Sequence, residues 1–168
     1  MTHRKKIAAT LLAGAAVAAT IAGAGAPAQA SEVFRMNIWK SSHCLDNATE
    51  KDSKLQMWNC GSGSEQRWIE EFNSGTGAST FANQRTGLCI SAPEFGAGTV
   101  IMDRCNSFLA NQQWRVFATG GDSTGSYIVW QNVSSGLCLT TPSVGNGTLV
   151  QTTECDTSDP YDLWQEQL

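Results

Sequence analysis

From Ser31 onward, the chain consists of short alternations of apolar and polar residues that turns interrupt. No stretch has the three-to-four-residue spacing of apolar positions that an amphipathic helix requires, whereas alternation with a period of two is typical of strands. Glycine-containing segments such as Phe95–Gly98 and Val144–Gly147 mark turns between the alternations. The pattern therefore predicts an all-β protein.

The alternating segments recur three times, each time with two cysteines and a tryptophan in the same order. The markers are Cys44, Cys60 and Trp68, then Cys89, Cys105 and Trp114, then Cys138, Cys155 and Trp164. The two cysteines are equally far apart in the first two copies and one position further apart in the third. Such a repeat predicts three copies of one unit, which we expect at roughly residues 31–78, 79–124 and 125–168. Three equal copies of a few short strands favour a closed β structure with pseudo-threefold symmetry, which hides its sheet edges.

The segment Met1–Ala30 has the composition of a secretory signal peptide. Three basic residues at positions 4–6 precede an uncharged run from Ile7 to Ala26, and Ala28–Ala30 has the small-x-small pattern of a cleavage site. The run is about long enough to span a bilayer, so an uncleaved membrane anchor is the alternative. We expect cleavage after Ala30, secretion to the extracellular space, and no membrane insertion of the remaining chain.

An exported chain with an even number of cysteines predicts disulfides. Six cysteines allow 15 pairings in principle, and the repeat selects the one in which each copy pairs its own two: Cys44–Cys60, Cys89–Cys105 and Cys138–Cys155. In the chain-entropy model each bridge stabilises the fold by roughly 3 kcal/mol.

Charge and composition exclude several classes of function. The signal segment holds three of the 11 Lys and Arg residues and none of the 15 Asp and Glu, so the remaining chain has a net charge of −7. Such an acidic domain is not expected to bind nucleic acid. After Ala30 the single histidine, His43, cannot form a metal site alone, and no phosphate loop or nucleophile elbow occurs. Glu70 and Glu71 would point to opposite faces of a strand, which argues against a glycosidase pair. We expect no enzyme activity, no cofactor and no metal.

The alternation also assigns side chains to two faces. The expected core positions before the second cysteine of each copy are Leu55, Met57, Val100, Met102, Val150 and Thr152. Trp58 belongs to the opposite face, where the other copies have Asp103 and Thr153, so its indole is expected to be exposed. After the first cysteine, Leu45, Ile90 and Leu139 should face the core, while Asp46, Ser91 and Thr140 should face solvent. The three recurring tryptophans are expected in a symmetric core.

Trp58, Asp46 and Gln56 together have the chemistry of a sugar-binding site. If Cys44 and Cys60 are directly opposed, Asp46 lies across from Trp58 with Cβ atoms about 5 Å apart, although a bulge would shift this register. An indole stacks on the apolar face of a pyranose, a carboxylate accepts hydrogen bonds from hydroxyls, and an amide donates and accepts them. A single shallow site of this kind predicts a Kd on the order of 1 mM. The alternative is an ordinary exposed tryptophan without a ligand.

These residues resemble the ricin-type lectin family of β-trefoils over nearly all of residues 31–168. The motifs that carry the resemblance are Cys44-Leu45-Asp46, Gln56–Cys60 and the two Gln-x-Trp motifs at residues 66–68 and 112–114. The resemblance implies twelve strands in three lobes, each with one shallow site for galactose, mannose or a polysaccharide such as xylan. It implies a first-lobe site formed by Asp46, Gln56, Trp58, Glu65 and Gln66.

The sequence departs from the family pattern at several positions. Glu65 stands where the family often has Asn, and a carboxylate accepts but does not donate hydrogen bonds, which argues against galactose. The charged loop Asn47–Lys54 lacks the Gly-x-Gly-Thr turn found at Gly96–Thr99 and Gly145–Thr148. In the second lobe, Ser91 and Asp103 stand at the positions of Asp46 and Trp58. In the third lobe, Thr140 and Thr153 stand there, Asp162 replaces the motif glutamine, and Tyr161 is the one aromatic ring that a ligand could contact. We therefore expect both lobes to be scaffold.

Three functional hypotheses follow from the sequence. The first is a secreted module that binds a glycan or polysaccharide through its first lobe. The second is a trefoil that binds a protein, of the inhibitor or toxin-accessory type, through the charged loop. The third is a trefoil without a working site. Glycosylation sequons at Asn47, Asn132 and Asn146 would matter only in a host that glycosylates.

Overall fold

The computed structural model describes residues 32–48 and 54–168. The predicted signal peptide over residues 1–30 lies outside the described residues, as do residues 49–53 of the charged loop. The described chain is all-β apart from three single-turn 3-10 helices, which confirms the predicted fold class.

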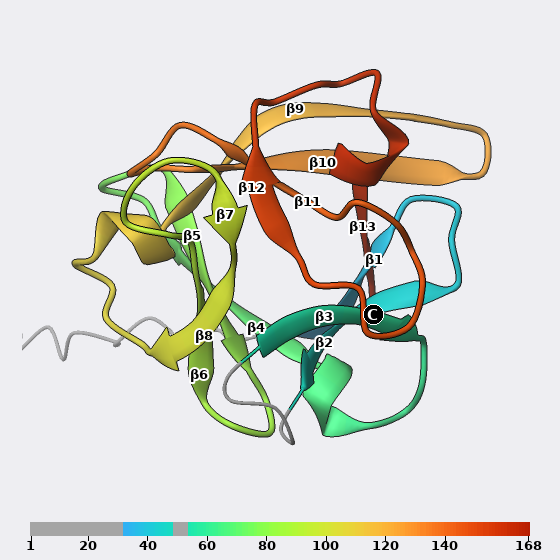
Figure 1. Ribbon diagram of the computed structural model, residues 1–168, viewed down its shortest axis with the longest axis horizontal. Helices are drawn as coiled ribbons and strands as arrows, with labels where there is room; N and C mark the ends of the chain where they lie inside the picture. The colour runs from blue at the N-terminus through green and yellow to red at the C-terminus, as the bar shows by residue number, and fades with distance from the viewer. Residues whose placement is uncertain (1–31, 49–53) are drawn as a thin grey trace, which may run out of the picture.

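Each repeat contributes the same series of elements (Figure 1). The first contains β1 (Val33–Ile38), β2 (His43–Ala48), β3 (Lys54–Asn59), η1 (Ser64–Gln66) and β4 (Trp68–Asn73). The second contains β5 (Ala78–Asn83), β6 (Leu88–Ser91), β7 (Gly98–Thr99), β8 (Ile101–Arg104), η2 (Ala110–Gln112) and β9 (Trp114–Asp122). The third contains β10 (Gly125–Asn132), β11 (Cys138–Thr140), β12 (Gln151–Thr153), η3 (Pro160–Asp162) and β13 (Trp164–Gln167). Because one residue separates β7 from β8, the described strands correspond to the twelve of a trefoil.

The first and last strands of the repeats form a closed barrel. β1 pairs with β4, β4 with β5, β5 with β9, β9 with β10, β10 with β13, and β13 returns to β1. All of these pairings are antiparallel. Closure leaves these strands with no free edge, as the repeat predicted.

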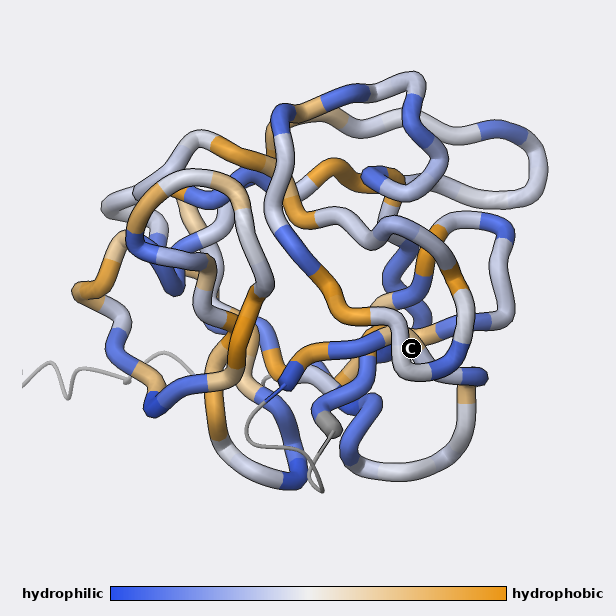
Figure 2. Tube along the Cα trace, in the orientation of Figure 1, coloured by the Kyte–Doolittle hydropathy of each residue, from blue (hydrophilic) through white to orange (hydrophobic). Residues whose placement is uncertain are grey.

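The middle strands form three hairpins, β2–β3, β6–β8 and β11–β12, that cover one end of the barrel (Figure 1). Hydrogen bonds between repeats join the hairpins at their centre: the Val100 N–H donates to the Val150 carbonyl (2.9 Å), and the Val150 N–H donates to the Leu55 carbonyl (3.0 Å). Figure 2 shows apolar colour on β3, on β8 and on the segment that leads into β12, where the hairpins meet. All three residues are fully buried, as the alternation predicted.

The three recurring tryptophans form the symmetric core that the repeat predicted. Trp68, Trp114 and Trp164 are completely buried. Each indole Nε1 donates to a backbone carbonyl earlier in its own repeat, at Leu45 (3.2 Å), Ile90 (3.2 Å) and Leu139 (2.8 Å). A buried indole is well accommodated only when its N–H has such an acceptor, so these bonds fix the ring orientation in every lobe.

The disulfides also follow the prediction. Cys44–Cys60, Cys89–Cys105 and Cys138–Cys155 are bonded, each with a Cα–Cα distance of 4.9 Å. Each bridge joins the start of one of the three hairpins that cover the barrel end, here called the cap hairpins, to the segment that leads into the 3-10 helix of the same repeat. The bridge in the first repeat therefore anchors both ends of the segment that carries Asp46, Gln56 and Trp58.

Candidate functional site

The β2–β3 hairpin positions the first-lobe residues, but not in the predicted register. Asp46 is paired with Gln56, and Cys44 is paired with Trp58. The prediction that Asp46 lies directly across from Trp58 is therefore wrong. Cys60 lies beyond the end of β3, where its N–H donates to the Ser42 carbonyl (2.9 Å), so the disulfide joins diagonal rather than opposed positions. Asp46 and Trp58 are therefore diagonal neighbours on one face of the hairpin, in the same relation as Cys44 and Cys60.

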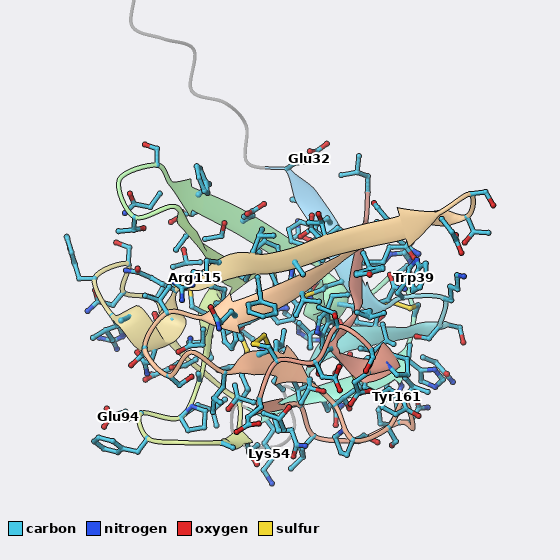
Figure 3. All side chains as sticks on the ribbon, turned by 90° about the horizontal axis from the view of Figure 1, so that it is seen from above. Glu32, Trp39, Lys54, Glu94, Arg115 and Tyr161 are labelled. Atoms are coloured by element: carbon cyan, nitrogen blue, oxygen red, sulfur yellow. A yellow bond between two sulfur atoms is a disulfide. The ribbon has the colours of Figure 1, made fainter. Side chains whose placement is uncertain are left out.

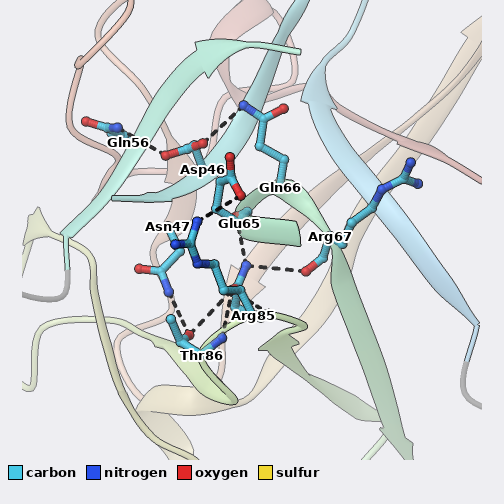
Figure 4. Close-up of polar contacts among 9 residues, drawn as sticks. Asp46, Asn47, Gln56, Glu65, Gln66, Arg67, Arg85 and Thr86 are labelled. Carbon is cyan, nitrogen blue, oxygen red and sulfur yellow. Dashed lines mark hydrogen bonds and ion pairs between the residues drawn. The ribbon is translucent and has the colours of Figure 1, made fainter. Parts of the chain in front are cut away.

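The carboxylate of Asp46 is held by two amides. Its Oδ1 accepts a hydrogen bond from Gln56 Nε2, and its Oδ2 accepts one from Gln66 Nε2, both at 3.1 Å (Figure 4). Asp46 is only 6% exposed, because η1 folds over this face of the hairpin and brings Gln66 against it. Burial raises the pKa of Asp46, while the hydrogen bonds from Gln56 and Gln66 act in the opposite direction.

A 3-10 helix that lies over the hairpin face also explains why the predicted exposure of three polar positions is wrong. Asp46, Ser91 and Thr140 were expected to face solvent, but all three are buried. In the second lobe, Asn111 Nδ2 from η2 donates to the Ser91 hydroxyl (3.1 Å). In the third, the Thr140 hydroxyl donates to the Tyr161 carbonyl of η3 (3.3 Å). In each repeat, a 3-10 helix distant in sequence shields the face that strand alternation assigns to solvent.

Trp58 provides an open aromatic surface beside this carboxylate. The residue is 43% exposed, which confirms the predicted surface position of its indole. Its counterparts are Asp103, which is exposed, and Thr153, which is partly buried. At this strand position, only the first lobe thus combines an aromatic ring with a carboxylate on the neighbouring strand.

Glu65 lies next to the carboxylate but is engaged elsewhere. Its Oε2 forms an ion pair with Arg85 Nη1 of the second repeat (3.4 Å; Figure 4). The Glu65 backbone carbonyl also accepts a hydrogen bond from Asn83 Nδ2 (2.8 Å). The five predicted site residues therefore lie together, with Trp58, Gln56 and Glu65 at the surface and Asp46 and Gln66 beneath them.

Comparison with known protein families identifies the domain. The ricin-type β-trefoil lectin domain matches residues 28–114, a span that ends at the tryptophan of the second Gln-x-Trp motif. The chain belongs to this family. None of the curated proteins compared with this ricin-type domain matches it.

Solved structures share the fold of this ricin-type domain at low identity. The designed threefold-symmetric protein ThreeFoil aligns with a TM-score of 0.68 and 18% identity over 81% of this chain and 98% of its own. A Polyporus squamosus lectin, solved with a sialylated trisaccharide epitope, aligns with a TM-score of 0.64 and 17% identity over 82% of this chain. A mosquitocidal holotoxin aligns with a TM-score of 0.70 and 14% identity over 82% of this chain. This chain spans 49% of the Polyporus lectin and 17% of the holotoxin.

The Gln of the Gln-x-Trp motif has a positioning role in this ricin-type domain. Gln66 Oε1 accepts from the Gly61 N–H (2.7 Å), and Nε2 donates to the Asn59 carbonyl (3.1 Å) as well as to Asp46. Gln112 repeats the first two contacts, with the Asn106 N–H and the Arg104 carbonyl. Both Nε2 hydrogens of Gln66 are therefore used within the protein, so this side chain orients Asp46 rather than reaching a ligand.

Asp162 keeps only half of this arrangement in the third lobe of the ricin-type domain. Its Oδ2 accepts from the Asp156 N–H (2.9 Å), but its Oδ1 is buried without a hydrogen-bond partner among the described residues. Burial raises the pKa of Asp162. Position 140 is the third-lobe equivalent of Asp46. Because Asp162 has no amide N–H, the third lobe lacks the donor with which Gln66 orients the Asp46 carboxylate.

Repeat three also borders the first-lobe site of this ricin-type domain, which sequence reasoning missed. The Met57 N–H donates to the Thr148 carbonyl (2.8 Å), and the Gly147 N–H donates to the Met57 carbonyl (2.9 Å). The first lobe lacks a Gly-x-Gly-Thr turn of its own, but the turn Gly145–Thr148 of the third repeat lies against its strand β3. The shared motif at Gly96–Thr99 is the only sequence signal that could have suggested such a neighbour.

A second group of carboxylates lies at the open end of the barrel. Glu70 and Glu166 line a hollow of about 380 Å³ together with Phe34, Ile128 and others. Figure 3 places Glu32, which lines this hollow, at the end of the molecule opposite Lys54 of the cap. Burial, with a contribution from the Glu70 charge, raises the pKa of Glu166 to about 7. Sequence reasoning missed this pair because its members are far apart in the chain.

The remaining expectations for the ricin-type domain concern metal sites, membrane-spanning helices and accessible glycosylation sequons. Within residues 32–48 and 54–168, no cluster of three or more His, Cys, Asp or Glu side chains could hold a metal ion. In the same part of the chain, no helix is long and apolar enough to cross a membrane. Of the three sequon asparagines, Asn47 and Asn132 are buried and Asn146 is exposed, so only Asn146 presents its side chain for modification in the folded domain.

Proposed function

We propose that this protein is a secreted carbohydrate-binding module whose main site is the first lobe. The observation that carries the proposal is the exposed indole of Trp58 beside Asp46, whose carboxylate is fixed by two amide donors. Membership of a lectin domain family supports sugar as the class of ligand. The sugar complex of the structurally similar Polyporus lectin supports the same class.

The geometry provides complementary roles for a pyranose ring. The apolar face of the sugar stacks on Trp58, while two adjacent hydroxyls donate to the remaining lone pairs of the Asp46 carboxylate. Gln56 Nε2 uses one hydrogen on Asp46 and keeps one for a sugar oxygen. Because Gln66 holds Asp46 from below, the carboxylate is already oriented before the ligand arrives, which reduces the entropy that binding must overcome.

The proposed ligand is a glycan or polysaccharide of the galactose, mannose or xylan type. Glu65 presents a carboxylate where an amide would favour galactose, and Arg85 neutralises it. A single shallow site gives a monovalent Kd on the order of 1 mM, so we propose binding to repeating polysaccharides rather than to isolated sugars. We propose a binding rather than a catalytic role, since Glu70 and Glu71 line different hollows.

The test is binding of the secreted domain, residues 31–168, to a glycan array and to insoluble xylan, galactan and mannan. We expect Asp46→Ala and Trp58→Ala each to lower binding at least tenfold. Asp103→Ala is the matched control, because it alters the position equivalent to Trp58 in the second lobe. Phe108→Ala controls for non-specific aromatic contact, since Phe108 is 92% exposed.

The outcomes separate the hypotheses. Binding that is lost in both first-lobe variants and kept in both controls supports the proposal. Binding that survives Asp46→Ala and Trp58→Ala contradicts the assignment of the site. If folded, oxidised protein binds no sugar in any format, the proposal fails.

A protein partner is the second candidate. The observation that favours it is the exposure of Phe95 and Phe108, at 89% and 92%, on two loops of the second repeat. Phenylalanine is enriched at protein interfaces relative to the rest of the surface. Capture of a purified protease or toxin subunit by wild-type protein, but not by a Phe95→Ser/Phe108→Ser variant, would support this alternative.

A further inference from the structure

The first-lobe site has a second wall that comes from the third repeat. The segment Gly147–Val150 runs antiparallel to β3: the Val150 N–H donates to the Leu55 carbonyl (3.0 Å), and Gln56 pairs with Leu149. Continuing this register places Gly147 opposite Trp58. The outward face of the hairpin therefore continues from β2 across β3 onto the third repeat.

Gly147 leaves the edge of the indole open. A Cβ atom built at this glycine would lie 3.9 Å from Trp58 Cζ3, so any side chain there would cover the rim of the ring. The backbone of Gly147 has φ = +82°, a conformation that favours glycine. The conformation of the turn thus keeps side chains away from the aromatic surface.

Asn146 is fixed at this rim with its NH2 group free. Its Oδ1 accepts a hydrogen bond from the Asn59 N–H at 2.8 Å. Because a backbone N–H can only donate, the oxygen must face Asn59, and Nδ2 faces away. Asn146 is exposed, and within the described part of the chain its Nδ2 donates to no protein atom.

We propose that Asn146 forms a second sugar subsite next to Trp58, so that the ligand of the first-lobe site is an oligosaccharide of at least two rings. This inference rests on the proposed function. The first ring occupies Trp58, Asp46 and Gln56, and the adjoining ring accepts a hydrogen bond from Asn146 Nδ2. The specificity of the site therefore depends on two repeats, although its stacking residue and its carboxylate belong to one.

The test compares monosaccharides with their disaccharides: xylose with xylobiose, galactose with galactobiose, and mannose with mannobiose. Titrations follow the Trp58 indole N–H resonance by NMR in wild type, Asn146→Ala and Asn73→Ala. Asn73 is the matched control, since it is an exposed asparagine whose Oδ1 accepts from the Gly75 N–H (2.9 Å) in the β4–β5 turn. One hydrogen bond of ordinary net strength corresponds to about a two- to tenfold change in Kd.

We expect one disaccharide to bind wild type and Asn73→Ala about fivefold more tightly than its monosaccharide. In Asn146→Ala this preference should disappear while the monosaccharide Kd stays within a factor of about two. A preference that persists in Asn146→Ala overturns the inference, as does equal weakening of both sugars or the absence of any preference in wild type. If neither these sugars nor the insoluble polysaccharides bind, the proposed function itself fails; sugar or polysaccharide binding without an Asn146-dependent gain refutes only the second subsite.

Discussion

Individual tryptophans in this protein have opposite roles that their burial distinguishes. Trp164 is fully buried with its Nε1 bonded to the Leu139 carbonyl, while Trp58 is 43% exposed. We expect Trp164→Ala to lower the free energy of unfolding by about 3–5 kcal/mol, because it opens a core cavity. Trp58→Ala should lower it by about 1 kcal/mol or less. Urea denaturation of both variants checks this, and equal losses would contradict the assignment of Trp58 to the surface.

Glu166 should make stability depend on pH. Its pKa is raised to about 7 in the folded protein, above its value in the unfolded chain, so folding favours the protonated form. The stability that this group contributes is complete below about pH 4.5 and is lost as pH rises towards 7. We expect Glu166→Gln to raise the free energy of unfolding by about 1–3 kcal/mol at pH 8 and to leave it unchanged at pH 4. Denaturation across this range is the measurement, and a pH-independent effect would contradict the role of titration.

At the scale of elements, each cap hairpin depends on its disulfide and its 3-10 helix. The first-lobe bridge anchors the segment that leads to Gln66, and Gln66 in turn holds Asp46. We expect Cys44→Ala/Cys60→Ala and Cys138→Ala/Cys155→Ala each to cost about 2–4 kcal/mol of stability, since their loops have nearly equal length. Only the first pair should weaken sugar binding at temperatures where both variants are folded. Equal loss of binding in both would show that the effect is general rather than local.

At the scale of the whole molecule, the pseudo-threefold arrangement offers equivalent positions in every lobe. In the third lobe, Thr140 pairs with Gln151 as Asp46 pairs with Gln56 in the first. Likewise, Cys138 pairs with Thr153 as Cys44 pairs with Trp58. Gln151 of the third lobe thus already matches Gln56. The third lobe has Thr140, Thr153 and Asp162 where the first lobe has its carboxylate, its indole and the glutamine of the Gln-x-Trp motif. We expect Thr140→Asp/Thr153→Trp/Asp162→Gln to install a second sugar site.

Calorimetric stoichiometry checks this gain of function. The number of bound ligands per chain should rise from one to two, and retention on insoluble polysaccharide should increase through multivalency. A folded triple variant that still binds one ligand would show that the neighbouring repeat supplies something that the three residues do not. The loop that borders the third lobe comes from repeat two, because Thr99 pairs with Gln151.

The sequence alone determined the features that recur in every repeat. The spacing of cysteines and tryptophans predicted the threefold all-β fold, the disulfide pairing and the buried tryptophans, and comparison of equivalent positions identified Trp58 as exposed. Strand alternation failed at Asp46, Ser91 and Thr140, because it cannot show that a 3-10 helix later in the same repeat covers the same face. Only the tertiary structure decided the register of Asp46 with Gln56, the contact of Gly147 and Asn146 with β3, and the pairing of Glu70 with Glu166. The contacts between repeats depend on how the repeats are arranged around the barrel, which places residues far apart in the chain beside one another. The hairpin register is local, but the cysteine spacing did not fix it, because the Cys44–Cys60 bridge joins diagonal rather than opposed positions.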